Sequence, residues 1–173
     1  LVVVGVGIEP VIDYLEGTGI AAAGAVPVNT SFETTASGIY AAGDIARYPD
    51  KNSGRMQRVE HWVAAEKQGI HAAKAMLGSK EPFSQLPFFW TRQHGVTIKY
   101  IGFEPDPDQL VYRGNPKEGP FVVGFYKEEY LRAVAGLNTS TEVFLLGEIL
   151  AAGMTIQPEE FENGDLNELC LRE

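Results

Sequence analysis

The sequence lacks the features that define several classes of protein. It contains one cysteine, Cys170, which excludes a disulfide framework within one chain and a zinc site built on cysteines. No run approaches about 20 consecutive apolar residues, so we expect no membrane span. Lysine and arginine total 14 against 23 aspartates and glutamates, a net charge of −9. A nucleic-acid-binding protein presents basic residues to phosphates, so we expect no nucleic-acid partner.

The histidines, the cysteine and the carboxylates show no metal-ligand spacing, so we expect no metal and no iron–sulfur centre. With 173 residues, 45% of them hydrophobic, the chain is long enough for one ordinary domain or two small ones. Residues 1–4 form an apolar, β-branched run that is typical of a buried strand. Because this strand would start without a lead-in, we expect the chain to be part of a larger protein.

The first half of the chain alternates apolar segments with glycine-rich turns. In chain order, we expect a short helix over 11–17, one or two strands within 20–28, a buried strand over 39–44, an exposed loop over 48–54, and a helix over 59–77 closed by Gly78. Prolines at 82 and 87 mark a change of composition, which predicts two domains, 1–80 and 81–173.

The second half carries aromatic and β-branched runs that are separated by short turns, a pattern typical of an antiparallel meander. We expect strands over 96–103, 109–113, 121–126 and 130–137, a helix over 141–154, and an acidic tail over 159–173 that makes core contacts through Phe161, Leu166, Leu169 and Leu171. Cys170, close to this acidic tail, is expected to be an unreactive thiol with a raised pKa.

The candidate binding motif is Ile39-Tyr40-Ala41-Ala42-Gly43-Asp44. Ligands of open α/β sheets bind at the carboxyl ends of strands, and a carboxylate there can accept hydrogen bonds from sugar or ribityl hydroxyls. An ordinary Gly-Asp turn explains the same residues equally well. The segment Gly5-Val6-Gly7-Ile8-Glu9-Pro10 lacks the third glycine of a dinucleotide fingerprint and has Pro10 in its place. This favours a tight crossover of the chain between two layers instead of a phosphate-binding loop.

Several short motifs, taken in order, carry a resemblance to a known family. They are Gly5-Val6-Gly7-x-x-Pro10, Thr34-Thr35, the motif at 39–44, Arg58-Val59-Glu60-His61-Trp62, Gln68-Gly69-x-x-Ala72-Ala73 and Pro87-Phe88-Phe89-Trp90-Thr91. The chain resembles the FAD-dependent pyridine nucleotide-disulfide oxidoreductases, in the ferredoxin reductase and apoptosis-inducing-factor-like branch.

This resemblance implies an α/β to α+β fold. Residues 1–80 would be the C-terminal half of an FAD-binding Rossmann-like domain, in which residues 1–8 return from an NAD(P)H domain that is missing here. Residues 81–173 would form a C-terminal reductase or dimerisation-type domain, an antiparallel sheet with helices.

The resemblance also implies roles for individual residues. Asp44 would hold the ribityl chain of FAD, and Gly43 would allow the backbone to approach it. Glu60, His61 and Trp62 would begin a helix that faces the flavin pyrimidine edge, where free N–H groups stabilise the negative charge of reduced flavin. Trp62 and Trp90 would line the flavin pocket, with plain core packing as the alternative. No residue is expected to be catalytic.

The implied activity is the transfer of electrons from NAD(P)H through FAD to a small iron–sulfur acceptor of the ferredoxin or Rieske type. The His-Pro and Glu pair of the disulfide reductases is absent, which disfavours that subclass. We expect a cytoplasmic protein, and we expect this chain to be inactive by itself, because neither the FAD pyrophosphate motif nor the NAD(P)H domain occurs in it.

Two interpretations of other classes stay open. Residues 87–173 could act as an interaction or homodimerisation module through Phe88, Phe89, Phe121 and Phe125, or the parent protein could be a redox-signalling protein of the apoptosis-inducing-factor-like type.

A basic loop stands out against the acidic composition. Arg47, Lys51, Arg55 and Arg58 fall within twelve residues, interrupted by Asp50 as the one acidic residue. Such a loop could steer an acidic iron–sulfur protein by complementary charge. An ordinary solvated loop is the alternative.

Overall fold

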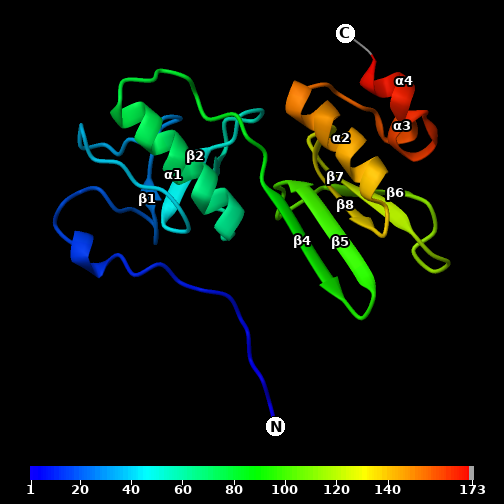
Figure 1. The fold of residues 1–173 in the computed structure, drawn as a ribbon, viewed down its shortest axis with the longest axis horizontal. Coiled ribbons are helices and arrows are strands. Elements are labelled where there is room, and N and C mark those ends of the chain that lie inside the picture. The colour runs from blue at the N-terminus through cyan, green and yellow to red at the C-terminus, as the bar shows by residue number, and fades with distance from the viewer. Residues whose placement is uncertain (172–173) are drawn as a thin grey trace. The chain divides into compact units, whose positions relative to one another are not determined.

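The structure is a computed structural model that describes residues 1–171. The chain folds into two compact units, Leu1–Phe83 and Ser84–Glu173. Figure 1 shows the elements of both units along the chain. No helix in the described part of the chain is both long and apolar enough to span a membrane.

The first unit holds a small sheet and one long helix. Strand β1 (Val26–Pro27) pairs in parallel with β2 (Ala46–Pro49), and β2 pairs antiparallel with β3 (Met56–Gln57). A 3-10 turn, η1 (Asp13–Leu15), precedes them, and helix α1 (Trp62–Met76) follows. Figure 1 shows the helix in green, after the blue and cyan strands.

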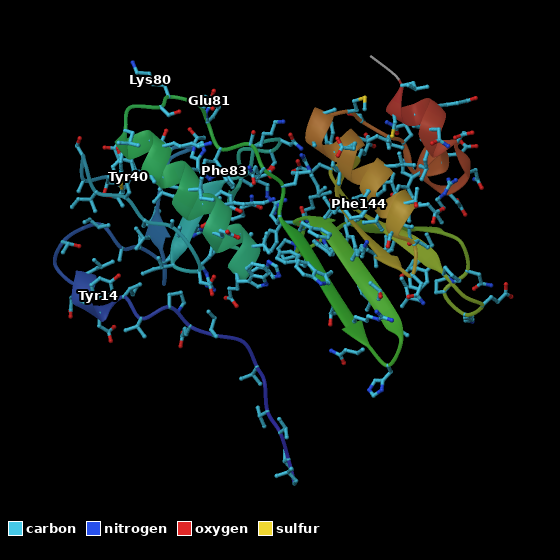
Figure 2. The ribbon with its side chains drawn as sticks, in the orientation of Figure 1. Tyr14, Tyr40, Lys80, Glu81, Phe83 and Phe144 are labelled. Atoms are coloured by element: carbon cyan, nitrogen blue, oxygen red, sulfur yellow. The ribbon has the colours of Figure 1, made fainter. Side chains whose placement is uncertain are left out.

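An aromatic cluster forms the core of this unit. Phe32 is completely buried, and Tyr48 is 2% exposed. The Phe83 ring, labelled in Figure 2, lies edge-on to both, with centroids 4.9 Å from Phe32 and 5.7 Å from Tyr48. Edge-to-face contacts of this kind add about 0.5–1.5 kcal/mol each beyond the burial of area.

Two strand predictions in this unit are wrong. Residues 1–4 form no strand, and their side chains are exposed, from 72% for Val4 upwards. Residues 39–44 form no regular strand either: Tyr40 makes one isolated bridge to Glu33, and β2 begins beyond the motif, at Ala46. Residues 1–4 fail because a β-branched run becomes a strand only where a neighbouring strand pairs with its backbone. Residues 39–44 pair at one position only, and the left-handed Gly43, with a φ of +85°, turns the chain away from an extended course.

The loop predicted over 48–54 is partly wrong, and the helix after it is confirmed. Tyr48 belongs to β2 and is buried, so the loop starts at Asp50. The predicted helix over 59–77 is α1, which ends at Met76 with Leu77 as its C-cap. Gly78 then adopts a φ of +96°, which glycine reaches without strain.

The second unit is a five-stranded antiparallel sheet in the order β4-β5-β8-β7-β6. Its strands are β4 (Phe88–Gln93), β5 (Val96–Gly102), β6 (Gln109–Arg113), β7 (Phe121–Lys127) and β8 (Tyr130–Leu137). The four predicted strands are confirmed, whereas β4 was not predicted. The sheet is not a simple meander, because β5 pairs with β8 instead of β6.

Three helices complete the second unit: α2 (Ser140–Ala152), α3 (Pro158–Asn163) and α4 (Leu166–Cys170). Helix α2 packs against β5 and β8, and α3 packs against β6. Completely buried side chains from both layers, such as Val122, Val134 and Leu146, form the core. The predicted contacts of Phe161, Leu166 and Leu169 are confirmed, but Leu171 is 82% exposed.

Candidate functional site

The turn at Gly43 and Asp44 is attached to helix α1 and to the segment that leads into it. The Gly43 N–H donates a hydrogen bond to Oε1 of Gln68, 25 residues further on, over 2.7 Å. The Asp44 carbonyl accepts one from Nη1 of Arg58 over 3.0 Å. The Ala46 N–H donates to the Gly43 carbonyl over 2.9 Å and closes the turn. We call residues 43–46 the Asp44 turn.

Glycine is needed at position 43 because of the backbone conformation. Its φ is +85°, in the left-handed region that other residues enter at a cost of roughly 1–2 kcal/mol. A Cβ at Gly43 would lie 3.6 Å from the Cβ of Ala65, an ordinary contact. The turn therefore packs against the first half of α1 at Ala65.

Arg58 joins two of the motifs. Besides its bond to the Asp44 carbonyl, it makes a 2.6 Å ion pair with Glu60, with the two side chains 27% and 35% exposed. The Asp44 carboxylate itself has no hydrogen bond or ion pair within residues 1–171. It is therefore an acceptor held next to the start of α1 and available to an external donor.

The start of α1 is formed as the sequence suggests. His61 is the N-cap residue, and its Nδ1 accepts a hydrogen bond from the Val63 N–H over 3.3 Å. Trp62 is 65% exposed, so it is not a core residue. Backbone N–H groups at a helix start carry a partial positive charge that favours an anionic ligand group.

The remaining predicted residues lie elsewhere. Trp90 belongs to β4 of the second unit, is 47% exposed and stacks on Phe88 with the ring centroids 5.5 Å apart. Arg47 lies in β2, while Lys51 and Arg55 are exposed on the loop between β2 and β3. Arg47 and Arg58 are both partly buried, and Arg58 is the one whose guanidinium bonds to the Asp44 carbonyl.

The residues of the first unit fit a flavin of the kind that the resemblance implies. The ribityl chain of a flavin carries hydroxyl donors, and the Asp44 carboxylate is an acceptor without an internal partner. No group of three or more potential metal ligands gathers in the described residues. The pKa of Cys170 is raised by burial and by the charge of Glu148, in the direction expected from the sequence.

Gln68 was part of a sequence motif, but its contact with Gly43 was not predicted. It is completely buried, on a helix face otherwise made of small residues such as Ala64 and Ala72. A polar side chain on a small, apolar helix face is a usable signal, because buried polar groups require partners.

Two protein families match the chain, one in each unit. Residues 1–69 match the family described as "Pyridine nucleotide-disulphide oxidoreductase". Residues 88–169 match "Reductase C-terminal".

Relatives with curated names agree with these matches. Apoptosis-inducing factor 3 of Homo sapiens is 33% identical over 163 residues, which covers 92% of this chain and 27% of that protein. The anthranilate 1,2-dioxygenase system ferredoxin–NAD(+) reductase component of Burkholderia cepacia is 29% identical and is covered to 40%. The chain therefore spans well under half the length of these relatives.

Solved structures show the same fold. A ferredoxin reductase from Rhodopseudomonas palustris superposes with a TM-score of 0.84 at 26% identity, covering 96% of this chain and 42% of that one. Putidaredoxin reductase, in its covalent complex with putidaredoxin, gives a TM-score of 0.85 at 22% identity, which supports the fold alone.

The fold and the two matches together define an oxidoreductase segment in which a cofactor-domain portion precedes a reductase C-terminal domain. More particularly, the chain belongs to the pyridine nucleotide-disulphide oxidoreductase family, in the ferredoxin reductase and apoptosis-inducing-factor-like branch, and corresponds to the C-terminal portion of those proteins.

Proposed function

We propose that this chain is the C-terminal portion of a flavoprotein that passes electrons from NAD(P)H through FAD to a small iron–sulfur protein. The observation that carries the proposal is the Asp44 turn, where a carboxylate without an internal partner is held beside a glycine and the start of α1. Relatives named as ferredoxin–NAD(+) reductase components, at 29% and 27% identity, support the acceptor class.

The chain's own residues would bind and orient the cofactor. Asp44 accepts hydrogen bonds from the ribityl hydroxyls, and Gly43 keeps the backbone clear of them. The start of α1, at Glu60, His61 and Trp62, directs N–H groups and the positive helix end toward the flavin pyrimidine edge. Trp62 and Trp90 are proposed as residues that line the flavin pocket, within the proposed domains 1–80 and 81–173 respectively. The flavin, when bound, supplies the redox chemistry.

The chain by itself is proposed to be inactive. No glycine-rich pyrophosphate motif occurs in its sequence, and the NAD(P)H site would lie outside it. The nicotinamide substrate and the FAD pyrophosphate would then be held by other parts of a longer protein, for which we propose a cytoplasmic location.

The acceptor would dock at the basic loop. Arg47, Lys51 and Arg55 follow one another along β2 and the loop to β3, on a chain whose net charge is −9. An acidic iron–sulfur protein is attracted by such a local positive patch. Arg58 has a different task, because it is engaged with Glu60 and the Asp44 carbonyl.

One observation favours a second candidate function, homodimerisation through the second unit. Phe89 and Phe125 both pack against the Tyr100 ring, with centroids at 5.7 and 5.3 Å, and strand alternation puts Phe121 on the same sheet face. Phe88 differs, because it packs with Phe144 of α2, labelled in Figure 2. A redox-signalling role is the further alternative, suggested by the relative named apoptosis-inducing factor 3.

The test is the variant Asp44→Asn in the longer flavoprotein. Losing a charged acceptor should raise the Kd for FAD about tenfold or more, since hydrogen bonds to charged groups contribute about 1.5–3 kcal/mol. Because the carboxylate has no internal partner, the free energy of unfolding of the apo-protein should change by less than about 0.5 kcal/mol. FAD titration of the apo-protein, followed by flavin fluorescence, measures the first quantity.

Asp13→Asn is the matched control. Asp13 is exposed in η1, away from the Asp44 turn in sequence, and the same change of charge there should leave the Kd for FAD unaltered. An Asp44→Asn protein that binds FAD as tightly as the parent would contradict the proposed function of the turn.

A further inference from the structure

Gln68 is an unusual residue for the middle of a packed helix. It lies on α1, is completely buried, and has Ala64 and Ala72 one turn away on either side. Its Oε1 accepts the Gly43 N–H at 2.7 Å. Because the Gln68 side chain is completely buried, water cannot replace it as the acceptor of the Gly43 N–H.

The other end of the same amide is not satisfied. Nε2 of Gln68 is buried and has no hydrogen-bond partner within the described residues. A buried donor in that state costs about 1–3 kcal/mol. The Tyr48 hydroxyl acts on this end of the amide: burial raises its pKa to about 12 and the Gln68 side chain lowers it in part, although the pair does not reach hydrogen-bond geometry. An apolar side chain of the same size would avoid the cost of Nε2 but would leave the Gly43 N–H unpaired.

Three consecutive peptide groups of the Asp44 turn are held in place. The peptide between residues 42 and 43 is held by Gln68, which accepts the Gly43 N–H. The peptide between residues 43 and 44 is held by the Ala46 N–H, which donates to the Gly43 carbonyl. The peptide between residues 44 and 45 is held by Arg58, which donates to the Asp44 carbonyl. The backbone on both sides of the Asp44 Cα is thus fixed, and the carboxylate keeps side-chain freedom alone. Of the two side chains that do this, Gln68 is buried, whereas the Arg58 side chain is 27% exposed.

We propose that Gln68 is a positioning residue, which holds the Gly43 peptide so that the Asp44 carboxylate meets the hydroxyl groups of the ligand without rearrangement. This inference rests on the proposed function, since it concerns the same turn. It assigns Gln68 a task in ligand affinity that differs from helix packing. A fixed acceptor loses less conformational entropy on binding than a mobile one, and therefore binds more tightly.

The test uses Gln68→Met in the longer flavoprotein, with two readouts. Hydrogen exchange at the Gly43 amide should become at least about tenfold faster, because the bond that protects it is gone. The Kd for FAD should rise at least about tenfold, the equivalent of about 1.4 kcal/mol. A residue with a merely structural role would lower the unfolding midpoint without a selective loss of FAD affinity.

The matched control is Gln57→Met, the same substitution at another buried glutamine of this unit, 7% exposed in β3. It should leave the Gly43 exchange rate and the Kd for FAD within about threefold of the parent. Gln68→Asn serves if the Met variant does not fold, because its amide is one methylene shorter and does not reach Gly43. Gln68→Glu keeps an acceptor oxygen and should retain the protection of the Gly43 amide.

The outcomes separate this inference from the proposed function. If the parent protein binds no FAD, the proposed function falls, and the inference with it. If the parent binds FAD and Gln68→Met or Gln68→Asn speeds exchange at Gly43 while the Kd for FAD is unchanged, the positioning role is wrong and the proposed function stands. Unchanged exchange at Gly43 in both variants also overturns the positioning role.

Discussion

At the scale of the residue, burial decides the chemistry of Tyr48. Burial raises the pKa of its hydroxyl to about 12, the Gln68 amide lowers it somewhat, and the charge of Asp50 raises it. The aromatic ring of Tyr48 packs against Phe32 and Phe83 in the core of the first unit. Tyr48 therefore reports on the integrity of the core below the Asp44 turn.

This pKa predicts a loss of stability in alkali. The unfolded chain loses the tyrosine proton near pH 10, whereas the folded chain keeps it to about pH 12. The contribution of Tyr48 to the free energy of unfolding is complete below pH 10. It falls by up to about 3 kcal/mol as the pH rises from about 10 to about 12. Urea unfolding between pH 8 and pH 12 measures this.

Tyr48→Phe is the control for the alkaline prediction. Its free energy of unfolding should fall less than that of the parent between pH 10 and pH 12, because phenylalanine has no proton to lose. Tyr126 in the second unit, whose pKa burial also raises, accounts for part of the remaining loss. Identical pH dependence of the parent and the variant would contradict the role of Tyr48.

At the scale of the element, one glycine sets the distance between β7 and α3. A Cβ at Gly124 would come within 2.9 Å of the Phe161 ring and 3.0 Å of a Leu131 methyl group. Phe161 is completely buried and cannot move aside. The close packing of this helix on the sheet therefore depends on the absence of a side chain at this position.

Gly124→Ala should lower the free energy of unfolding of the second unit by about 1–3 kcal/mol, the usual cost of one extra methyl group in a packed core. Gly119→Ala is the matched control, because nothing lies within 4 Å of a Cβ there. It should change stability by less than about 0.5 kcal/mol. Equal urea midpoints for the two variants would show that α3 packs more loosely than described.

Elements whose sequence signals lie within their own segment were predicted correctly more often than elements that depend on distant partners. Helix α1 and helix α2 were predicted because their apolar periodicity and glycine ends are contained within the segment. Strand β4 was not predicted, although its pairing from Phe88 to Gln93 is regular. Residues 88–93 are three aromatic residues followed by three polar ones, so they lack the alternation of apolar and polar side chains that predicts a half-buried strand.

At the scale of the whole molecule, net charge and local charge point in opposite directions. The chain carries −9 overall, yet β2 and the loop to β3 carry Arg47, Lys51 and Arg55. Long-range repulsion of an acidic partner by the net charge is screened by salt over about 8–10 Å, whereas attraction at the loop acts at contact. The local patch should therefore govern docking at physiological salt.

Charge reversal within this loop tests the docking proposal in the longer protein. Lys51→Glu should slow electron transfer to an acidic iron–sulfur protein severalfold at low ionic strength, and the difference should shrink as salt is added. Lys80→Glu is the control with the same change of charge, on the exposed segment after α1 where Figure 2 labels it. Equal rates for the two variants, or a parent rate independent of salt, would overturn docking at the loop.

The sequence by itself determined the family, the change of composition between the two halves, and the helices and strands whose patterns repeat every few residues. The tertiary structure decided what depends on partners distant in the chain. Residues 1–4 were predicted as a strand but have no ladder neighbour within the described chain, and residues 39–44 make one isolated bridge, from Tyr40 to Glu33, so neither segment is a regular strand. Asp44 is positioned by Arg58 and Gly43 by Gln68, 14 and 25 residues away, and such hydrogen bonds exist only once α1 has packed against the turn.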